Sequence, residues 1–208
     1  MSELQQKGKL AKQAARILTT ASPAMKNKAL EQMAQALVDA AGPIIEQNKL
    51  DLDNAREKGT SQAMLDRLAL TRERISQMAE GIRQIAALND PIGKMDEVSM
   101  RPNGLQIGRK RVPLGVIGII YEARPNVTAD AAALTLKTSN AVILRGGSEA
   151  IHSNKIIVDT MNQAILAAGL PEGTLQLVED TRRETAVELM RLNEYVDVLI
   201  PRGGGGLI

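Results

Sequence analysis

The length, charge and composition of the chain narrow its functional class before any motif is considered. Its 208 residues carry 26 Lys and Arg against 24 Asp and Glu, so the positive excess expected of a nucleic-acid binder is missing. Phe and Trp are absent and there are two Tyr, which leaves little to build base-stacking platforms or membrane-interface belts. With no Cys and one His, these residues exclude zinc sites, thiol nucleophiles and Ser-His catalysis.

The start of the chain shows no secretory signal. Met1-Ser2-Glu3 is not followed by an apolar core and small residues, and the longest apolar run, residues 114–121, is far too short to span a bilayer. The sequence therefore predicts a soluble cytoplasmic protein without a membrane or nucleic-acid partner.

Residues 3–88 predict a run of helices. Apolar residues recur at helical spacing, and residues that lose little rotamer freedom in helices are frequent. Ser22-Pro23 indicates an N-cap followed by proline at the first helical position, and Gly42 indicates a left-handed stop, so we expect a helix at about 23–41. Thr71 is expected to cap the last long helix of this part.

A β-hairpin is predicted between residues 95 and 111. Two short strand-like runs flank Arg101-Pro102-Asn103-Gly104, where Pro followed by Asn-Gly suits a tight turn. The hairpin carries four basic residues, Arg101, Arg109, Lys110 and Arg111. Such a cluster could meet an anionic ligand, but solvated strand faces and subunit contacts are commoner explanations.

After Pro113 apolar runs alternate with helical stretches. Strands are expected at about 114–121, 141–144, 175–178 and 196–200, with helices at 128–137, 148–168 and 181–193. The last helix opens with Thr181-Arg182-Arg183-Glu184, which has capping-box spacing. Strands that are apolar throughout must be covered on both faces, as in parallel sheets with crossover helices. We therefore predict an α/β fold: N-terminal helices, a β-hairpin, then a doubly wound, Rossmann-like parallel sheet.

The last predicted strand is followed at once by Arg202 and four glycines. Folds of this type place a ligand-binding turn there and then a covering helix, and the sequence given has no such helix. One face of the strand would then expose apolar side chains to water. We therefore expect the chain to be the front part of a longer protein.

Two glycine-rich loops at the carboxyl ends of strands are candidate cofactor sites. Arg145-Gly146-Gly147-Ser148 leads into a helix, whose amides and positive dipole end could hold a phosphate beside the arginine. Arg202-Gly203-Gly204 repeats that arrangement after the last strand. The alternative is that these glycines only serve tight turns, although two such loops on one sheet edge favour a nucleotide.

Asn126 stands in an unusually polar link between a buried strand and a helix. Two roles suit it. Its side chain could cap the helix, or its amide nitrogen could point into the cleft as an oxyanion donor.

Five stretches of this sequence resemble one known family. They are Ser61-Gln62-Ala63-Met64-Leu65-Asp66-Arg67-Leu68, Arg111-Val112-Pro113-Leu114-Gly115-Val116-Ile117-Gly118, Tyr121-Glu122-Ala123-Arg124-Pro125-Asn126-Val127-Thr128, Ala141-Val142-Ile143-Leu144-Arg145-Gly146-Gly147 and Leu199-Ile200-Pro201-Arg202-Gly203-Gly204. The resemblance is to the gamma-glutamyl phosphate reductases, also called glutamate-5-semialdehyde dehydrogenases, within the aldehyde dehydrogenase superfamily. It runs through essentially the whole chain.

The resemblance implies an activity, a cofactor and partners. The activity is reduction of L-glutamate 5-phosphate by NADPH to the semialdehyde and phosphate, in proline biosynthesis. In that family a cysteine forms a thioacyl enzyme, and because this chain has none, the nucleophile is expected beyond Ile208. The resemblance also implies a homo-oligomer and association with glutamate 5-kinase.

The resemblance also implies roles for individual residues. Asn126 would be the oxyanion donor, and Arg145 would lie near the adenosine ribose, within reach of a 2′-phosphate. Gly146 and Gly147 replace the superfamily's usual residues, and Ser148 and Glu149 compete for the position of its ribose-binding glutamate. Arg202, Gly203 and Gly204 would lie near the cofactor pyrophosphate.

The resemblance divides the chain into three parts. Residues 1–94 would be the helical part of the cofactor-binding domain, 95–111 an oligomerisation hairpin, and 112–208 the Rossmann-like NADPH-binding core, with the catalytic domain absent. A different reading remains open: a non-catalytic module of the same fold that binds a nucleotide or a partner chain.

Overall fold

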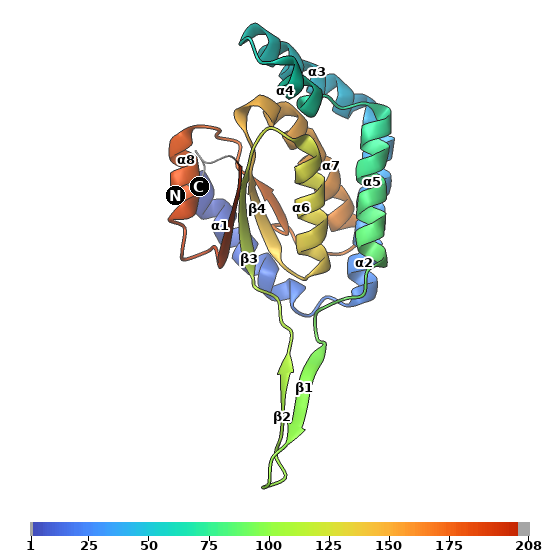
Figure 1. Cartoon of the computed structure of the whole chain (residues 1–208), viewed down its shortest axis with the longest axis vertical. Helices are drawn as coiled ribbons and strands as arrows, with labels where there is room; N and C mark the ends of the chain where they lie inside the picture. The colour runs from blue at the N-terminus through green and yellow to red at the C-terminus, as the bar shows by residue number, and fades with distance from the viewer. Residues whose placement is uncertain (1, 204–208) are drawn as a thin grey trace.

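A computed structural model describes residues 2–203 and contains a four-stranded sheet with helices on both faces (Figure 1). The strand order is β5-β4-β3-β6, and every neighbouring pair is parallel. The strands are β3 (Val116–Tyr121), β4 (Ala141–Arg145), β5 (Leu175–Leu177) and β6 (Val198–Arg202). The structure therefore confirms the predicted α/β fold with a parallel sheet.

The two central strands are the most apolar because both of their faces are covered. All of β3 is buried, as is β4 up to its final arginine. Strand β6 lies at the edge and starts two positions later than expected, since Asp197 precedes it as an anchor. The Asp197 carboxylate accepts from the backbone N–H of Val116 at 2.8 Å. Ile200, in β6, remains 43% exposed.

Helices form layers on either side of the sheet. One face is covered by α1 (Glu3–Leu18) and α8 (Arg183–Met190), the other by α6 (Pro125–Lys137) and α7 (Ile151–Ala167) (Figure 1). Two helices, α2 (Pro23–Asp39) and α5 (Arg72–Ala87), pack outside α6 and α7. At the carboxyl end of the strands lie α3 (Ala41–Glu57) and α4 (Gln62–Leu68) (Figure 1).

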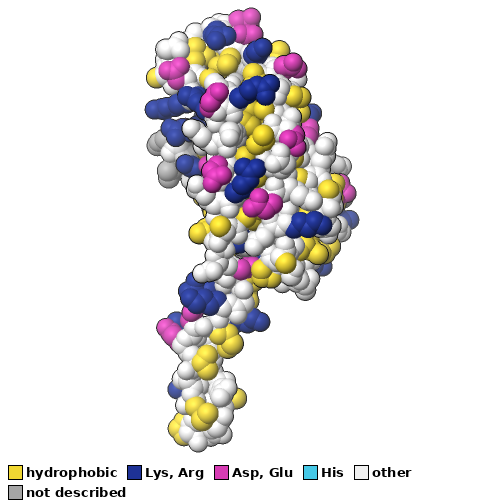
Figure 2. Space-filling view, turned by 90° about the vertical axis from the view of Figure 1, so that its right-hand side faces the viewer, with side chains coloured by type: hydrophobic (Ala, Val, Ile, Leu, Met, Phe, Trp, Pro, Cys, Tyr) yellow, Lys and Arg dark blue, Asp and Glu magenta, His cyan; other side chains and the backbone are white. Residues whose placement is uncertain are grey.

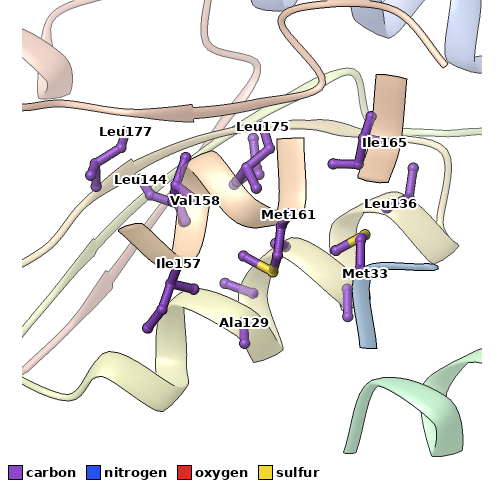
Figure 3. Packing of buried hydrophobic residues seen from close by; sticks show 14 of the residues in the cluster. Met33, Ala129, Leu136, Leu144, Ile157, Val158, Met161, Ile165, Leu175 and Leu177 are labelled. Carbon is purple, nitrogen blue, oxygen red and sulfur yellow. The ribbon is translucent and has the colours of Figure 1, made fainter. Parts of the chain in front are cut away.

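The core between the sheet and α7 consists of aliphatic and methionine side chains. Figure 3 shows Ile157, Val158, Met161 and Ile165 of α7 among side chains from the strands, α6 and α2. Met33 and Met161 are fully buried, as suits a flexible side chain that fills irregular core space.

The predicted helix stop at Gly42 and the predicted capping box at Thr181 were wrong. Helix α2 ends at Asp39 and α3 starts at Ala41, so Gly42 lies inside a helical turn and is not a left-handed stop. Helix α8 starts at Arg183, after Arg182 as N-cap, without any capping side chain. The predicted capping box at Thr181 therefore does not form. The cap at Thr71 is confirmed, because its hydroxyl accepts from the N–H of Arg74 at 3.2 Å.

The predicted hairpin is confirmed, and it projects from the amino end of the sheet (Figure 1). It consists of β1 (Met95–Met100) and β2 (Gln106–Lys110), and Gly104 in its turn has a φ of +84°. Two of its basic residues form ion pairs with acidic residues of β1, Arg109 with Glu97 and Arg111 with Asp96. These pairs favour the explanation of a solvated strand face over that of an anion site.

Apolar side chains also gather on the hairpin (Figure 2). Those exposed by 43–69% are Met95, Val98, Met100, Leu105 and Ile107. Because the projecting hairpin has no core of its own, these apolar side chains stay exposed and form a patch that could serve as a contact surface. Along residues 2–203 no helix combines the length and the apolar character that crossing a bilayer requires.

Candidate functional site

Three cavities adjoin the loop that follows β3, at the carboxyl edge of the sheet. The α5–α6 cavity has a volume of about 470 Å³, the β3–β4 cavity about 410 Å³ and the β3–β6 cavity about 220 Å³. Arg124 lines all three. The loops after parallel strands meet at this edge, which is where open α/β sheets bind ligands.

Asn126 lies in the first turn of α6 and not before it. The helix begins at Pro125 instead of near Thr128, and its N-cap is Arg124, without a capping side chain. The capping role considered for Asn126 is therefore wrong. Its side chain lines the α5–α6 cavity, and its Nδ2 donates to Oδ2 of Asp130 at 3.5 Å.

Asp130 follows Asn126 by one helical turn and lines the same cavity. Its burial raises the pKa of the carboxyl, while Arg202 and the Asn126 amide oppose the rise. The neighbouring helix leaves room for this carboxyl, since a Cβ built on Gly81 would be 3.9 Å from Asp130 Oδ1.

The remaining walls of the α5–α6 cavity come from α5, α4 and the segment between them. Arg74 of α5 donates from Nη1 to the backbone oxygens of Asp66 and Ala69, which ties the end of α4 to α5. Arg67 lines both this cavity and the β3–β4 cavity, and it forms no ion pair within residues 2–203.

The β3–β4 cavity contains three of the predicted cofactor residues, Arg145, Gly147 and Glu149. Nη2 of Arg145 donates to the backbone oxygen of Thr181 at 2.6 Å, and its buried Nε has no hydrogen-bond partner in the described part of the chain. Burial lowers the pKa of Arg145, opposed by Glu149 and Asp180, but a guanidinium stays charged at neutral pH. Arg145 thus lines the cavity with a guanidinium that has one buried, unpaired N–H in the described part of the chain.

Glycine at 146 and 147 is required by close packing. A Cβ on Gly147 would lie 2.7 Å from Oε2 of Glu149 and 3.1 Å from the backbone N of Ala123. A Cβ on Gly146 would overlap Nδ2 of Asn154 and approach the Tyr121 hydroxyl to 3.1 Å. Any side chain here would push the loop away from β3, so both glycines have a structural reason.

Behind Gly146 runs a chain of buried hydrogen bonds. The Tyr121 hydroxyl and Thr128 Oγ1 are 2.8 Å apart, and Thr128 Oγ1 donates to Oδ1 of Asn154 at 2.7 Å. Burial raises the pKa of Tyr121 well above its ordinary value, so the phenol stays protonated. These hydrogen bonds hold β3, α6 and α7 in fixed positions relative to one another, directly behind the cavities.

The amino end of α7 does not present its amides to the cavity, contrary to the expectation for this helix. Ser148 and Glu149 form a short 3-10 turn, and α7 itself begins at Ile151. The Asp51 carboxylate accepts from the N–H groups of His152 at 3.1 Å and Ser153 at 2.8 Å. An acidic side chain of α3 therefore already occupies the positive end of the helix dipole.

The second glycine-rich loop, which follows β6, is described in part. Arg202 and Gly203 line the β3–β6 cavity together with Tyr121 and Arg124. Gly204 lies outside the described residues, so its predicted contribution has no structural account here.

Sequence reasoning missed the five charged residues that line the α5–α6 cavity, namely Asp66, Arg67, Arg74, Arg124 and Asp130. Helical spacing from Asn126 would have indicated Asp130, because residues four apart share a face. Nothing local to α4 or α5 could have indicated that they face α6. Within residues 2–203 no cluster of His, Cys, Asp and Glu suited to a metal ion occurs.

Comparison with known proteins gives concordant results. Residues 3–201 match the model of the aldehyde dehydrogenase family. The gamma-glutamyl phosphate reductase of Clostridium beijerinckii is 64% identical over 208 residues, covering 100% of this chain and 50% of that relative. The reductase of Heliobacterium modesticaldum is 60% identical over 207 residues. The chain thus spans about half the length of the curated relatives it matches.

Solved structures agree with this. The crystal structure of gamma-glutamyl phosphate reductase from Thermotoga maritima matches 99% of this chain and 50% of its own, with a TM-score of 0.97 and 42% identity. The enzyme from Saccharomyces cerevisiae gives a TM-score of 0.91 and 35% identity, over 100% of this chain and 53% of its own. A probable aldehyde dehydrogenase from Listeria monocytogenes, at 16% identity, shares the fold with a TM-score of 0.75. The chain belongs to the aldehyde dehydrogenase family, and within it is similar along its whole length to gamma-glutamyl phosphate reductases.

Proposed function

We propose that the full-length protein reduces L-glutamate 5-phosphate to L-glutamate 5-semialdehyde and phosphate with NADPH, and that this chain is its cofactor-binding half. The names of the relatives support the reaction class. One observation carries the proposal for this chain. Asn126, Arg145 and Arg202 line three cavities that adjoin at one sheet edge and share Arg124.

The β3–β4 cavity has the donor set that an adenosine 2′-phosphate needs. Arg145 lines this cavity, and a guanidinium binds phosphate oxygens in a fixed geometry. Glu149, and beside it Ser148, could accept or donate to ribose hydroxyls. Gly147 keeps this cavity open, while Gly146 lets the loop settle on Tyr121 and Asn154.

The β3–β6 cavity would hold the pyrophosphate side. Arg202 supplies positive charge there, and Gly203 and Gly204 would let backbone N–H groups come close to phosphate oxygens. The nicotinamide cofactor, when bound, supplies the hydride for the reduction. These residues of the chain bind and orient it.

Asn126 would act on the reacting carbonyl. When a nucleophile adds to an acyl phosphate, negative charge collects on the carbonyl oxygen, and a preorganised N–H donor stabilises that charge by about 3–4 kcal/mol. The amide of Asn126 lines a cavity and makes only a weak contact of 3.5 Å to Asp130, so it is available for this role. The chain has no cysteine, and the thiol nucleophile would come from the rest of the full-length protein.

The proposed enzyme is a cytoplasmic homo-oligomer that assembles through the hairpin. The exposed apolar side chains of β1 and β2 support this, because isolated patches of that kind mark contact surfaces. Association with glutamate 5-kinase stays a prediction of the family resemblance alone.

The experiment is an assay of the purified full-length protein. We expect NADPH oxidation only when L-glutamate 5-phosphate is present, and a decrease in turnover of about 100-fold or more in Asn126→Ala, with the Kd for NADPH unchanged. Asn54→Ala, an exposed position on α3, is the matched control and should keep full turnover. Oxidation that ignores the acyl phosphate would overturn the reaction, and unchanged turnover would remove Asn126 from its role.

A further inference from the structure

The α5–α6 cavity carries charges of both signs around one space. Arg67, Arg74 and Arg124 line it together with two carboxylates, Asp66 and Asp130. A cavity for a simple dianion would be expected to exclude carboxylates, since like charges repel the ligand. An α-amino acid carries an ammonium and a carboxylate on one carbon, so it matches a mixed lining.

We propose that the α5–α6 cavity recognises the free α-amino-acid end of the substrate, with Asp130 binding the α-ammonium group and Arg67 the α-carboxylate. The inference rests on the proposed function and deepens it by naming the residues that select the substrate. It distinguishes an amino-acid substrate from an acyl phosphate or aldehyde that has the same chain and no amino group.

The position of Asp130 suits a bound cation. Its carboxyl is half-buried, Gly81 of α5 leaves space beside Oδ1, and Oδ2 has a single weak contact, 3.5 Å from Nδ2 of Asn126. A contact at that distance is easily exchanged for a shorter bond to an ammonium. Burial raises the pKa of Asp130, and a cation bound beside it offsets this cost of burial.

The spacing from Asn126 also fits. Asp130 follows Asn126 by four residues, a rise of about 6 Å along the helix axis, and the facing side-chain atoms, Asn126 Nδ2 and Asp130 Oδ2, are 3.5 Å apart. In a five-carbon amino acid the C5 carbonyl carbon and the α-nitrogen are separated by four bonds, or about 5 Å when extended. Asn126 can therefore contact the reacting end while Asp130 contacts the amino end.

Arg67 suits the α-carboxylate. It belongs to α4, lines the cavity together with Asp130, and forms no ion pair within residues 2–203. Arg74 is less suited because its Nη1 is already bound to two backbone oxygens of α4 and its following segment. An arginine without a carboxylate partner can take a ligand carboxylate in a two-bond geometry.

The competing carboxylate is Asp66. Its Oδ1 accepts from Nε2 of Gln62 at 3.0 Å, and its side chain is exposed. Water screens a charge in that position more strongly than one at Asp130. Asp130 is therefore the assignment that the structure favours.

The test measures selectivity in the reverse reaction of the full-length protein, with phosphate and NADP⁺. Two aldehydes are compared, L-glutamate 5-semialdehyde and 5-oxopentanoate, which lacks the α-amino group, each at its measured open-chain concentration. We expect Asp130→Asn to lower kcat/KM for the amino aldehyde by about 10- to 100-fold, mainly through a higher KM, and to change kcat/KM for 5-oxopentanoate by less than about threefold. Arg67→Gln should lower kcat/KM for both aldehydes, since both carry the carboxylate.

The outcomes are distinguishable. Asp53→Asn, an exposed aspartate on α3, is the matched control and should preserve the selectivity. The inference is overturned if Asp130→Asn lowers kcat/KM equally for both aldehydes while its thermal unfolding matches that of the unmutated protein. It is also overturned if Asp66→Asn, and not Asp130→Asn, loses the selectivity for the amino aldehyde. A protein inactive on both aldehydes and on L-glutamate 5-phosphate would contradict the proposed function itself.

Discussion

Charged side chains at the two ends of the parallel sheet differ in how far they are paired within the protein. At the amino end Lys26 is 1% exposed, and its ammonium donates to Asp90 at 2.6 Å, to Ser139 Oγ at 2.7 Å and to the Lys137 oxygen at 3.1 Å. At the carboxyl end Arg67 and Arg124 line open cavities and form no ion pair within the described residues. The first arrangement uses every donor of an ammonium inside the protein, whereas in the second two guanidinium groups stand at cavity walls without an ion-pair partner in the described residues.

Lys137 strengthens the contrast. Its Nζ donates to Oδ1 of Asn27 at 2.7 Å and to the Ala86 oxygen at 2.8 Å, and burial lowers its pKa. Two lysines and one aspartate thus join α2, α5 and α6 just where the chain leaves for the hairpin. Buried charge of this kind indicates a structural junction, and it should affect stability more than activity.

The largest expected effect is on stability, from the amino end. Lys26→Met should lower the free energy of unfolding by about 3 kcal/mol or more, because it removes a buried ammonium and leaves the half-buried Asp90 without its partner. Urea unfolding of the full-length protein measures this. Lys28→Met, an exposed position on the same helix, should change the free energy by less than about 0.5 kcal/mol. Equal effects at the two positions would refute the structural assignment.

The second effect is at the carboxyl end. Gly146→Ala should cost about 1–3 kcal/mol, because the added methyl group overlaps Asn154 and crowds Tyr121. It should also raise the Kd for NADPH by displacing the loop. Gly42→Ala is a matched control: nothing lies within 4 Å of an added Cβ, and the gain should be up to about 1 kcal/mol. Thermal unfolding should therefore give a lower Tm for Gly146→Ala and a higher Tm for Gly42→Ala than for the unmutated protein.

A third effect concerns the cofactor. Arg145→Gln should raise the Kd for NADPH about 10-fold more than the Kd for NADH, since one charge-assisted hydrogen bond to a 2′-phosphate contributes about 1.5–3 kcal/mol. Fluorescence titration of both cofactors gives the ratio. Lys155→Gln, an exposed cation of α7 paired with Glu179, should leave that ratio unchanged. Equal weakening of the two cofactors would rule out the contact.

The smallest effect is a pH dependence of stability. Burial alone would raise the pKa of Asp90, but the Lys26 ammonium and the Ile92 amide lower this pKa below its ordinary 3.8. The folded state therefore binds the proton less tightly than the unfolded chain. The stabilisation from ionised Asp90 is fully present above the pKa of the unfolded state and is lost as the pH falls through the lower pKa of the folded state. The stability difference between the unmutated protein and Asp90→Asn should stay constant from pH 7 to about 5 and narrow in more acid solution. A difference that grew on acidification would contradict this sign.

Local signals predicted much of the fold. Apolar runs located the buried strands, Pro-Asn-Gly located the hairpin turn, and Thr71 was identified as a cap, because each depends on neighbours in sequence. The site was harder to predict. Asp51 fills the amino end of α7 from 101 positions away, and no local pattern reports such a contact. The start of α6 was missed although Pro125 favours the first position of a helix, because Asn126 also suits a cap.

The burial of Tyr121 has a practical consequence for measurement. The chain has no tryptophan, and this phenol, 2% exposed, lies at the end of β3 and lines both the β3–β4 and the β3–β6 cavities. Its ultraviolet emission overlaps the absorption band of a reduced nicotinamide. Excitation of this chain should therefore transfer energy to a dinucleotide seated at the sheet edge, providing an optical reporter of occupancy without a label.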